Sequence, residues 1–475
     1  MSFPSDFIWG AATSSYQIEG GRTQHGRGPS VWDTFCRQPG KVRGGDTGDV
    51  ASDHVNRYRE DVALMKEIGL HAYRLSIAWP RVMPDGVGAV SETGLAFYDR
   101  LVDELLGAGI QPWVTLFHWD LPLSIHHRGG WMNPASPDWF DEFTKAVVDR
   151  LSDRVSNWFT INEPQVFIGM GYGSGEHAPG LKLPLDDQLR MGHHVLLAHG
   201  RAARTIRERA RTAPQIGWAP VGKVGIPADR NRDLQAARDL TNTVGDDPVW
   251  SNTWWSDPVF LGGYPEDGLS KYGTALPAGW EREMELIHQP TDFYGANIYR
   301  GEIVRATDSG EHQVLPPRTG TPRSDFGWEI TPDVLEWGAR FFYERYGKPV
   351  IITENGMSNA DWVNIAGEVD DPQRIDYVTR HLLGLGRAID DGVPVRGYFL
   401  WSLLDNFEWA EGYHQRFGLV HVDFETQQRT PKKSAGFYRQ VIETNGGLLG
   451  SLPRSAAGEE PFIVDRDRRP QGNTP

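Results

Sequence analysis

The stretch GLAFYDRLVDELLGAGIQPWVTLFHW, residues 94 to 119, holds a helix followed directly by a strand. In its first part, apolar residues recur on one face at helical spacing: Tyr98, Leu101, Leu105 and Ala108. Glycines at 107 and 109 then mark the helix end. QPWVTLFHW, from Gln111, is a near-continuous apolar run, as expected of a parallel strand that is covered on both faces. The stretch therefore predicts part of a βαβ unit.

Seven further apolar, β-rich segments alternate with helical patterns along the chain. They are FIWGAAT from Phe7, HAYRLSIAW from His71, VSNWFTIN from Val155, QIGWAPV from Gln215, DFYGANIY from Asp292, KPVIIT from Lys348 and VRGYFLWS from Val395. Eight strands alternating with helices predict an α/β fold of the (β/α)8 TIM barrel class. A barrel needs about 250 residues, so the rest of this single domain must form long βα loops. An open doubly wound sheet is the alternative, but no GxGxxG follows the first strand.

The end of the chain differs in composition from the rest. We assign residues 1–452 to the barrel domain and 453–475 to a polar, Pro-containing tail, which we expect to be loosely ordered. No Pro/Gly/Ser linker or internal repeat divides the first part. The boundary near 452 is therefore the one change in organisation that the sequence predicts.

Composition restricts the partners and the compartment. The chain of 475 residues has a formal net charge of −15, which argues against nucleic acid or an anionic membrane as its main partner. No apolar stretch approaches the ~20 residues of a membrane helix. The start, MSFPSDFIWG, lacks a basic segment followed by an apolar run, so we expect no signal peptide and a cytoplasmic location. The single cysteine, Cys36, is expected to be an inert buried thiol.

Polar and aromatic side chains gather where the predicted strands end, which in such a barrel is the catalytic face. These positions hold Gln17, Arg74, His118, Trp119, Asn162, Glu163, Asn297, Tyr299, Glu354, Trp401, Glu408 and Trp409. Sugar hydroxyls need many polar partners, and the face of a pyranose packs on a flat aromatic ring. Amides, carboxylates and tryptophans together therefore favour a carbohydrate pocket.

Two of these residues, Glu163 and Glu354, are carboxylates on the fourth and seventh strands, which face each other across a barrel mouth. A single Glu at a strand end has a structural role as often as a catalytic one. A pair of carboxyl groups that flank one glycosidic bond is the arrangement that cleaves glycosides. The sequence therefore predicts glycoside hydrolysis by this pair.

Several motifs, taken together and in order, resemble the family 1 glycoside hydrolases, the β-glucosidases and their relatives. They are FIWGAATSSYQIEG, GPSVWDTF, YRLSIAWPR, FHWDLP, TINEP, HAPG, TENG and NFEWAEGYHQRFGLVHVDF, and the resemblance ends at RTPKKSA. It covers nearly the whole chain outside the tail. The resemblance implies a retaining β-glycosidase that removes terminal β-D-glucosyl residues, with galactosyl and fucosyl residues as further substrates and cellulose degradation as a setting. It implies small-molecule glycosides as partners, no cofactor and no metal.

The resemblance also implies a role for each matching residue. Glu354 is the expected nucleophile and Glu163 the general acid and later the general base. Arg74 is expected to pair with Glu354, and Tyr299 to donate a hydrogen bond to it. Residues expected to contact the sugar are Gln17, His118, Asn162, Tyr299, Glu408 and Trp409, with Trp401 under the ring; supporting residues are Arg74, Asn297, Trp119, Trp328 and Phe417. A retaining pair requires carboxyl groups ~5–5.5 Å apart, whereas an inverting pair requires ~6.5–9.5 Å.

Three other functions stay open at this stage. A 6-phospho-β-glycosidase would need a cationic site near Glu408, and a non-catalytic sugar-binding barrel would lack one of the two carboxylates. A metal hydrolase could use the pairs His126-His127 and His193-His194, but no HxH or HExxH accompanies them. Gln165 follows NEP where many relatives carry Trp, so the leaving-group preference is also open, as is the choice between monomer and homo-oligomer.

Overall fold

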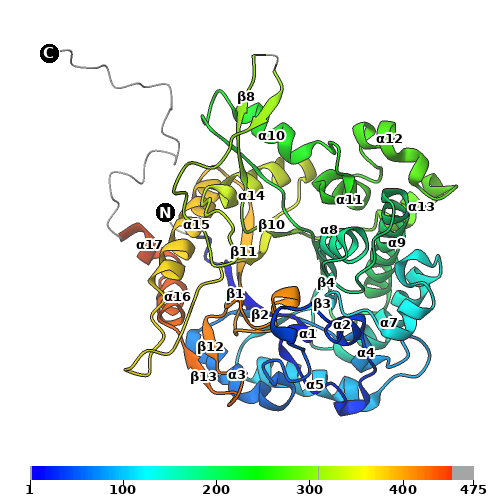
Figure 1. The fold of residues 1–475 in the computed structure, drawn as a ribbon, viewed down its shortest axis with the longest axis vertical. Coiled ribbons are helices and arrows are strands. Elements are labelled where there is room, and N and C mark those ends of the chain that lie inside the picture. The colour runs from blue at the N-terminus through cyan, green and yellow to red at the C-terminus, as the bar shows by residue number, and fades with distance from the viewer. Residues whose placement is uncertain (1–2, 309, 452–475) are drawn as a thin grey trace.

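Eight parallel strands run through the centre of the protein and form a nearly closed barrel (Figure 1). The computed structural model describes residues 3–308 and 310–451, so the tail assigned to 453–475 lies outside the described residues. The barrel strands are β1 (Ile8–Ala12), β2 (Ala72–Ser76), β3 (Gln111–Phe117), β4 (Asn157–Asn162), β5 (Gln215–Ala219), β7 (Tyr294–Asn297), β10 (Val350–Asn355) and β11 (Val395–Trp401). Each falls within or overlaps one of the eight segments expected from sequence, which confirms the barrel.

A ring of helices surrounds the strands (Figure 1). The helices between consecutive barrel strands include α3 (His54–Ile68), α5 (Glu92–Gly107), α7 (Ser136–Leu151), α9 (Leu185–Arg209), α13 (Trp280–Ile287), α14 (Val334–Tyr346), α15 (Pro372–Asp390) and, after the last strand, α16 (Lys433–Glu443). In α5 the predicted face is buried, and the Ser91 side chain caps the helix by accepting a hydrogen bond from the N–H of Gly94. Across the described residues, no helix is long and apolar enough to span a membrane.

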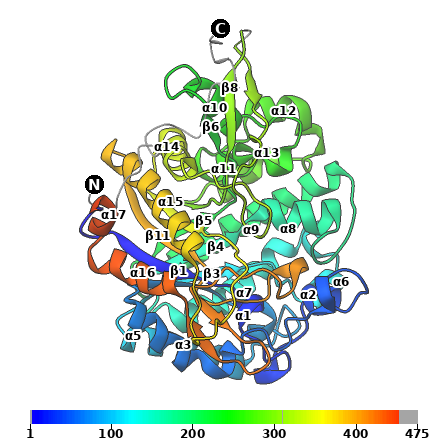
Figure 2. The ribbon, with the colours of Figure 1, turned by 60° about the vertical axis from the view of Figure 1, so that its left-hand side comes forward.

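The long βα loops carry short helices and two small sheets that the sequence did not predict. The short helices are α1 (Ser15–Ile18), α2 (Val31–Phe35), α4 (Trp79–Val82), α6 (Leu123–His127), α8 (Pro164–Ile168), α10 (Leu234–Asn242), α11 (Asn252–Phe260), α12 (Glu266–Tyr272) and α17 (Gly447–Ser451). One sheet joins β6 (Gly225–Pro227), β8 (Glu302–Ala306) and β9 (His312–Val314), and the other joins β12 (Val420–Val422) and β13 (Arg429–Pro431). Figure 2 shows β6, β8 and α10 gathered at one end of the molecule.

The interior of the barrel is filled by aromatic side chains rather than left open. Trp113, Phe159, Phe293 and Phe399 come from four different strands or strand ends, and their ring centroids lie 5.3 to 5.7 Å apart. All four side chains are buried. The barrel is therefore a packed core, and any cavity at its mouth has a dry, rigid floor.

The sheet has its two edges at β5 and β7, so the barrel closes along a seam between these strands. At the C-terminal end of the seam, the N–H of Asn297 donates to the carbonyl oxygen of Pro220 at 3.0 Å, and the N–H of Gly222 donates to that of Asn297 at 2.8 Å. At position 295 only glycine fits, because a Cβ there would lie 2.5 Å from the carbonyl oxygen of Trp218. The seam thus depends on a close backbone approach and a few hydrogen bonds.

A buried ionic network joins the loops that follow β10 and β11. The Lys432 Nζ donates to Asp361 Oδ2 at 2.6 Å and to Asp405 Oδ1 at 2.7 Å. Arg374 also pairs with Asp361 at 2.6 Å, and Arg416 pairs with Asp405 at 2.7 Å. Asp405 starts the loop that leads to Glu408 and Trp409, so this network fixes one side of the barrel mouth.

We expect Lys432→Met to lower the free energy of unfolding by about 3–5 kcal/mol, because it leaves two buried carboxylates short of a cation. Urea denaturation would measure the change. Lys433→Met is the matched control: its side chain is 47% exposed and pairs with a half-exposed Glu368, so we expect no measurable loss. Equal losses in the two variants would contradict a structural role for the buried network.

Candidate active site

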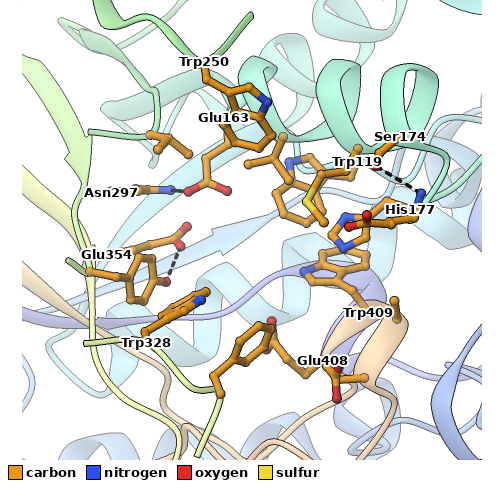
Figure 3. A pocket seen from close by; sticks show the side chains of 18 of the residues that line it. Trp119, Glu163, Ser174, His177, Trp250, Asn297, Trp328, Glu354, Glu408 and Trp409 are labelled. Carbon is orange, nitrogen blue, oxygen red and sulfur yellow. Dashed lines mark hydrogen bonds between the residues drawn. The ribbon is translucent and has the colours of Figure 1, made fainter. Parts of the chain in front are cut away.

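A cavity of about 990 Å³ opens at the C-terminal ends of the barrel strands. Most of the predicted site residues line it: His118, Trp119, Glu163, Asn297, Tyr299, Trp328, Glu354, Trp401, Glu408, Trp409 and Phe417. The other predicted residues, Gln17, Arg74 and Asn162, are buried behind this wall and contact residues that form it. In Figure 3, Glu163 and Glu354 point toward a common space, with Asn297 beside them and Glu408 and Trp409 on the far side.

Glu354 ends the apolar part of β10 and is held by two donors. Arg74 Nη1 donates to its Oε1 at 2.5 Å, and the Tyr299 hydroxyl donates to its Oε2 at 2.7 Å. Burial raises the pKa of the Glu354 carboxyl above its ordinary value, while the Arg74 charge and the Tyr299 hydrogen bond oppose that rise. The two contacts favour an ionised carboxylate with a fixed orientation.

Arg74, on β2, is itself held from several sides. Its Nη2 donates to Asn162 Oδ1 at 2.6 Å, and its Nη1 donates to the carbonyl oxygen of Thr353 at 3.1 Å. The guanidinium carbon lies 4.9 Å from the centroid of the Phe159 ring, which belongs to the aromatic interior of the barrel. The cation therefore has little freedom to move away from Glu354.

Glu163, directly after β4, has a different environment. Its backbone is left-handed, with φ of 45°, and its N–H donates to the carbonyl oxygen of Ala219 at 2.8 Å. Its Oε1 accepts a hydrogen bond from Asn297 Nδ2 at 2.9 Å. Burial raises the pKa of the Glu163 carboxyl well above its ordinary value, and the charge of Glu354 raises it further. Within the described residues no ion pair reaches Glu163, so a proton is favoured on this carboxyl group.

The polar residues around the rest of the cavity are linked to one another. Asn162 Nδ2 donates to His118 Nε2 at 3.2 Å, and burial lowers the pKa of His118 so far that its ring is neutral. Gln17 Nε2 donates to Glu408 Oε2 at 3.3 Å. Burial, followed by the charge of Glu354, raises the pKa of Glu408 to about 8, so this carboxyl group carries a proton at neutral pH. Neutral amides and a protonated acid can each donate and accept hydrogen bonds with sugar hydroxyls.

Aromatic rings form the remaining walls. Trp119 and Trp409 lie with their ring centroids 4.5 Å apart, and both have left-handed backbones, with φ of 78° and 50°. Trp401 stacks on the His118 ring at 5.9 Å, and Trp328 lies 6.2 Å from Phe417. These rings enclose a space with flat apolar faces, which suits a pyranose ring.

Sequence reasoning did not assign several residues that line the cavity. They include Val166, Met170, His177, Val221, Trp250, Arg300, Glu302 and Phe326. His177 belongs to the HAPG motif, which was a usable signal, and its side chain is buried against Trp119. Trp250 comes from a loop far from any strand end and had no local signal in the sequence.

The His193-His194 pair serves the fold. In α9, His193 contacts the Tyr264 hydroxyl through Nδ1 and Glu283 through Nε2, both at 2.9 Å, and the Nδ1 of His194 donates to the carbonyl oxygen of Trp131. Over residues 3–308 and 310–451, no group of three or more His, Cys, Asp or Glu side chains is placed to hold a metal ion. The arrangement thus lends no support to the metal-hydrolase alternative.

Comparisons with known proteins identify the family of the chain. The model of glycosyl hydrolase family 1 matches residues 1–447. The 1,4-β-D-glucan glucohydrolase of Thermotoga neapolitana and β-glucosidase A of Thermotoga maritima are each 42% identical over 454 residues, covering 94% of this chain and 99% and 98% of those proteins. The solved β-glucosidase from Thermotoga maritima in complex with deoxynojirimycin has a TM-score of 0.85 at 41% identity, covering 94% of this chain and 99% of that one. The resemblance noted in the sequence is confirmed, and the chain belongs to glycosyl hydrolase family 1.

Proposed function

We propose that this protein is a β-glucosidase that hydrolyses terminal β-D-glucosyl residues with retention of anomeric configuration. The observation that carries the proposal is the unequal environment of two glutamates in one cavity. Glu354 has a cation and a hydroxyl on its two oxygens, whereas Glu163 has a neutral amide. Such a pair supplies one ionised nucleophile and one protonated acid at the same pH.

In the first step, a carboxylate oxygen of Glu354 attacks the anomeric carbon from one face of the sugar. The bond from that carbon to the leaving oxygen breaks, and Glu163 gives its proton to this oxygen. The products are a glucosyl ester on Glu354 and the free alcohol. Arg74 and Tyr299 keep the attacking carboxylate ionised and aimed.

In the second step, water attacks the same carbon from the opposite side. Glu163 is now the base that removes a proton from the water, and the ester bond to Glu354 breaks to restore the carboxylate. Esterification has removed the negative charge of Glu354, which is one of the two groups that raise the pKa of Glu163. Glu163 can therefore lose its proton in one step and regain it in the next.

The names of the similar proteins support glucosides, including β-1,4-linked glucans, as substrates. We extend the proposal to galactosides and fucosides as slower substrates, because these sugars differ from glucose at few hydroxyls. A role in cellulose breakdown follows from the same linkage. The cytoplasmic location and the oligomeric state stay predictions.

The environment of Glu408 argues against the 6-phospho-β-glycosidase alternative. Its carboxyl group lines the cavity, and within the described residues no cation pairs with it. A sugar phosphate placed beside Glu408 would lack a positive charge to balance its own charge. A neutral sugar is the better match.

Glu354→Ala should reduce turnover of 4-nitrophenyl β-glucoside by roughly 10³-fold or more, because the variant lacks the nucleophile. Added azide fits the vacated space and should restore activity with a glycosyl azide of inverted configuration as product. Product analysis by NMR gives the configuration. Substantial activity without azide would refute the role of Glu354.

Glu163→Ala should slow hydrolysis of methyl β-glucoside or cellobiose by roughly 10²–10⁴-fold, the usual contribution of a general acid. Glycosylation by 2,4-dinitrophenyl β-glucoside should be almost unaffected, because this leaving group needs no proton. Burst kinetics would then reveal accumulation of the glycosyl-enzyme. A loss of equal size for both kinds of leaving group would argue against an acid role.

Tyr299→Phe should shift the acid limb of the kcat/KM profile to higher pH. The Tyr299 hydrogen bond lowers the pKa of Glu354, so its removal raises that pKa, and the nucleophile is protonated over a wider acidic range. We also expect kcat/KM to fall roughly tenfold or more, as for loss of a hydrogen bond to a charged group. Tyr294→Phe, on β7 and bonded to Ser256, is the control and should leave the profile unchanged.

A further inference from the structure

The side chain of Gln165, two residues after Glu163, is turned away from the cavity. It is only 1% exposed and is not among the residues that line the cavity. Its Nε2 donates to the carbonyl oxygen of Val221, and its Oε1 accepts from the N–H of Val221, both at 3.3 Å. This reciprocal pair reproduces the exchange of two hydrogen bonds between paired residues of neighbouring strands.

Val221 lies at the seam between β5 and β7, and its position explains why it needs this partner. The residues on either side of it, Pro220 and Gly222, bond to the backbone of Asn297 on β7. Successive residues of an extended chain direct their N–H and C=O groups to opposite sides. The backbone groups of Val221 therefore face away from β7, and the Gln165 amide takes the place of a further strand there.

The same segment leads back to the acid. Asn297 is bonded through its backbone to the seam and through its Nδ2 to Glu163 Oε1 at 2.9 Å. The Asn297 Oδ1 in turn accepts a hydrogen bond from Thr353 Oγ1 at 2.6 Å. A series of contacts thus runs from Gln165 through the Val221 segment and Asn297 to Glu163, two residues before Gln165 in the chain.

We propose that Gln165 is a positioning residue, whose side-chain amide holds the seam closed at Val221 and thereby keeps Asn297 on the general acid Glu163. The inference rests on the proposed function, since it takes Glu163 as the acid. Gln165 acts on the reaction through the backbone of Val221 rather than by touching the substrate.

Opening of the seam at Val221 should change the pKa of Glu163. Asn297 donates to the carboxylate of Glu163 and so stabilises its ionised form. If the seam opens, this hydrogen bond weakens and the pKa of Glu163 rises. Steps in which Glu163 gives up its proton then become slower, whereas Glu354 keeps its contacts with Arg74 and Tyr299, which hold it ionised.

The test is Gln165→Met, which keeps the length of the side chain and removes its donor and acceptor. We expect kcat/KM for cellobiose to fall roughly tenfold, as for the loss of two neutral hydrogen bonds. For 2,4-dinitrophenyl β-glucoside it should change less than about twofold, since that leaving group needs no proton. The basic limb of the cellobiose profile should move to higher pH, and amide hydrogen exchange should increase at Val221.

Two further variants make the outcome decisive. Gln188→Met removes a side-chain amide that bonds the carbonyl oxygen of Leu183, away from the seam, and should keep the wild-type dependence on the leaving group. Gln165→Glu preserves the shape and the acceptor but turns a carboxylate oxygen toward the carbonyl oxygen of Val221, so it should show a change in the same direction. It serves in place of Gln165→Met if that variant does not fold.

Equal losses for the two substrates, or a lower unfolding temperature with unchanged kinetics, would overturn the positioning role and leave Gln165 a packing residue. Wild-type dependence on the leaving group in Gln165→Glu would do the same. Absence of turnover by the wild-type enzyme on either glucoside would instead refute the proposed function itself, so the two failures are distinguishable.

Discussion

The pairing of Arg74 with Glu354 in a dry site is the constraint on which the rest of the active site depends. Both side chains are under 5% exposed, and a buried charge that lacks a partner costs several kcal/mol. The guanidinium is therefore satisfied on every side, by a carboxylate, an amide, a carbonyl oxygen and the face of Phe159. The packed aromatic interior of the barrel lies directly below Arg74 and Glu354. It excludes water from the two side chains and is rigid, so it keeps them in place.

The position of Arg74 decides which of the two glutamates, Glu163 or Glu354, holds a proton. Glu163 and Glu354 have the same chemistry in isolation, and only their neighbours differ. Arg74 contacts Glu354 directly, so the remaining charge falls on that residue and raises the pKa of Glu163. The neutral amide of Asn297 accommodates Glu163 both with and without its proton, which a second arginine would not do. In the proposed mechanism Glu163 acts first as an acid and then as a base, and such a neutral contact suits both states.

The barrel and the convergence of the two glutamates were predictable, because both follow from local periodicity and from the rule that parallel strands end on one face. Which of the site residues line the cavity and which are buried behind its wall was not predictable. Gln17, Arg74 and Asn162 also follow strands or lie on them, yet they are buried behind the cavity wall. Trp250 reaches the cavity from a loop, and the small sheets consist largely of strands too short to show a period. These features arise from contacts between segments far apart in the chain, which no local pattern encodes.

The seam between β5 and β7 is formed by such long-range contacts, and it lies next to the two glutamates. A barrel of parallel strands must close somewhere, and here a few backbone hydrogen bonds and the Asp292 carboxylate, which accepts from the N–H of Ile216, join the two edges. The Gln165 side chain holds Val221 from the side away from β7. The seam lies beside Glu163 and Asn297, whereas Glu354 is on β10, an inner strand that pairs with β7 and β11. Changes in the loops at the seam are therefore expected to act first on the contact between Asn297 and Glu163, because Glu354 keeps separate contacts with Arg74 and Tyr299.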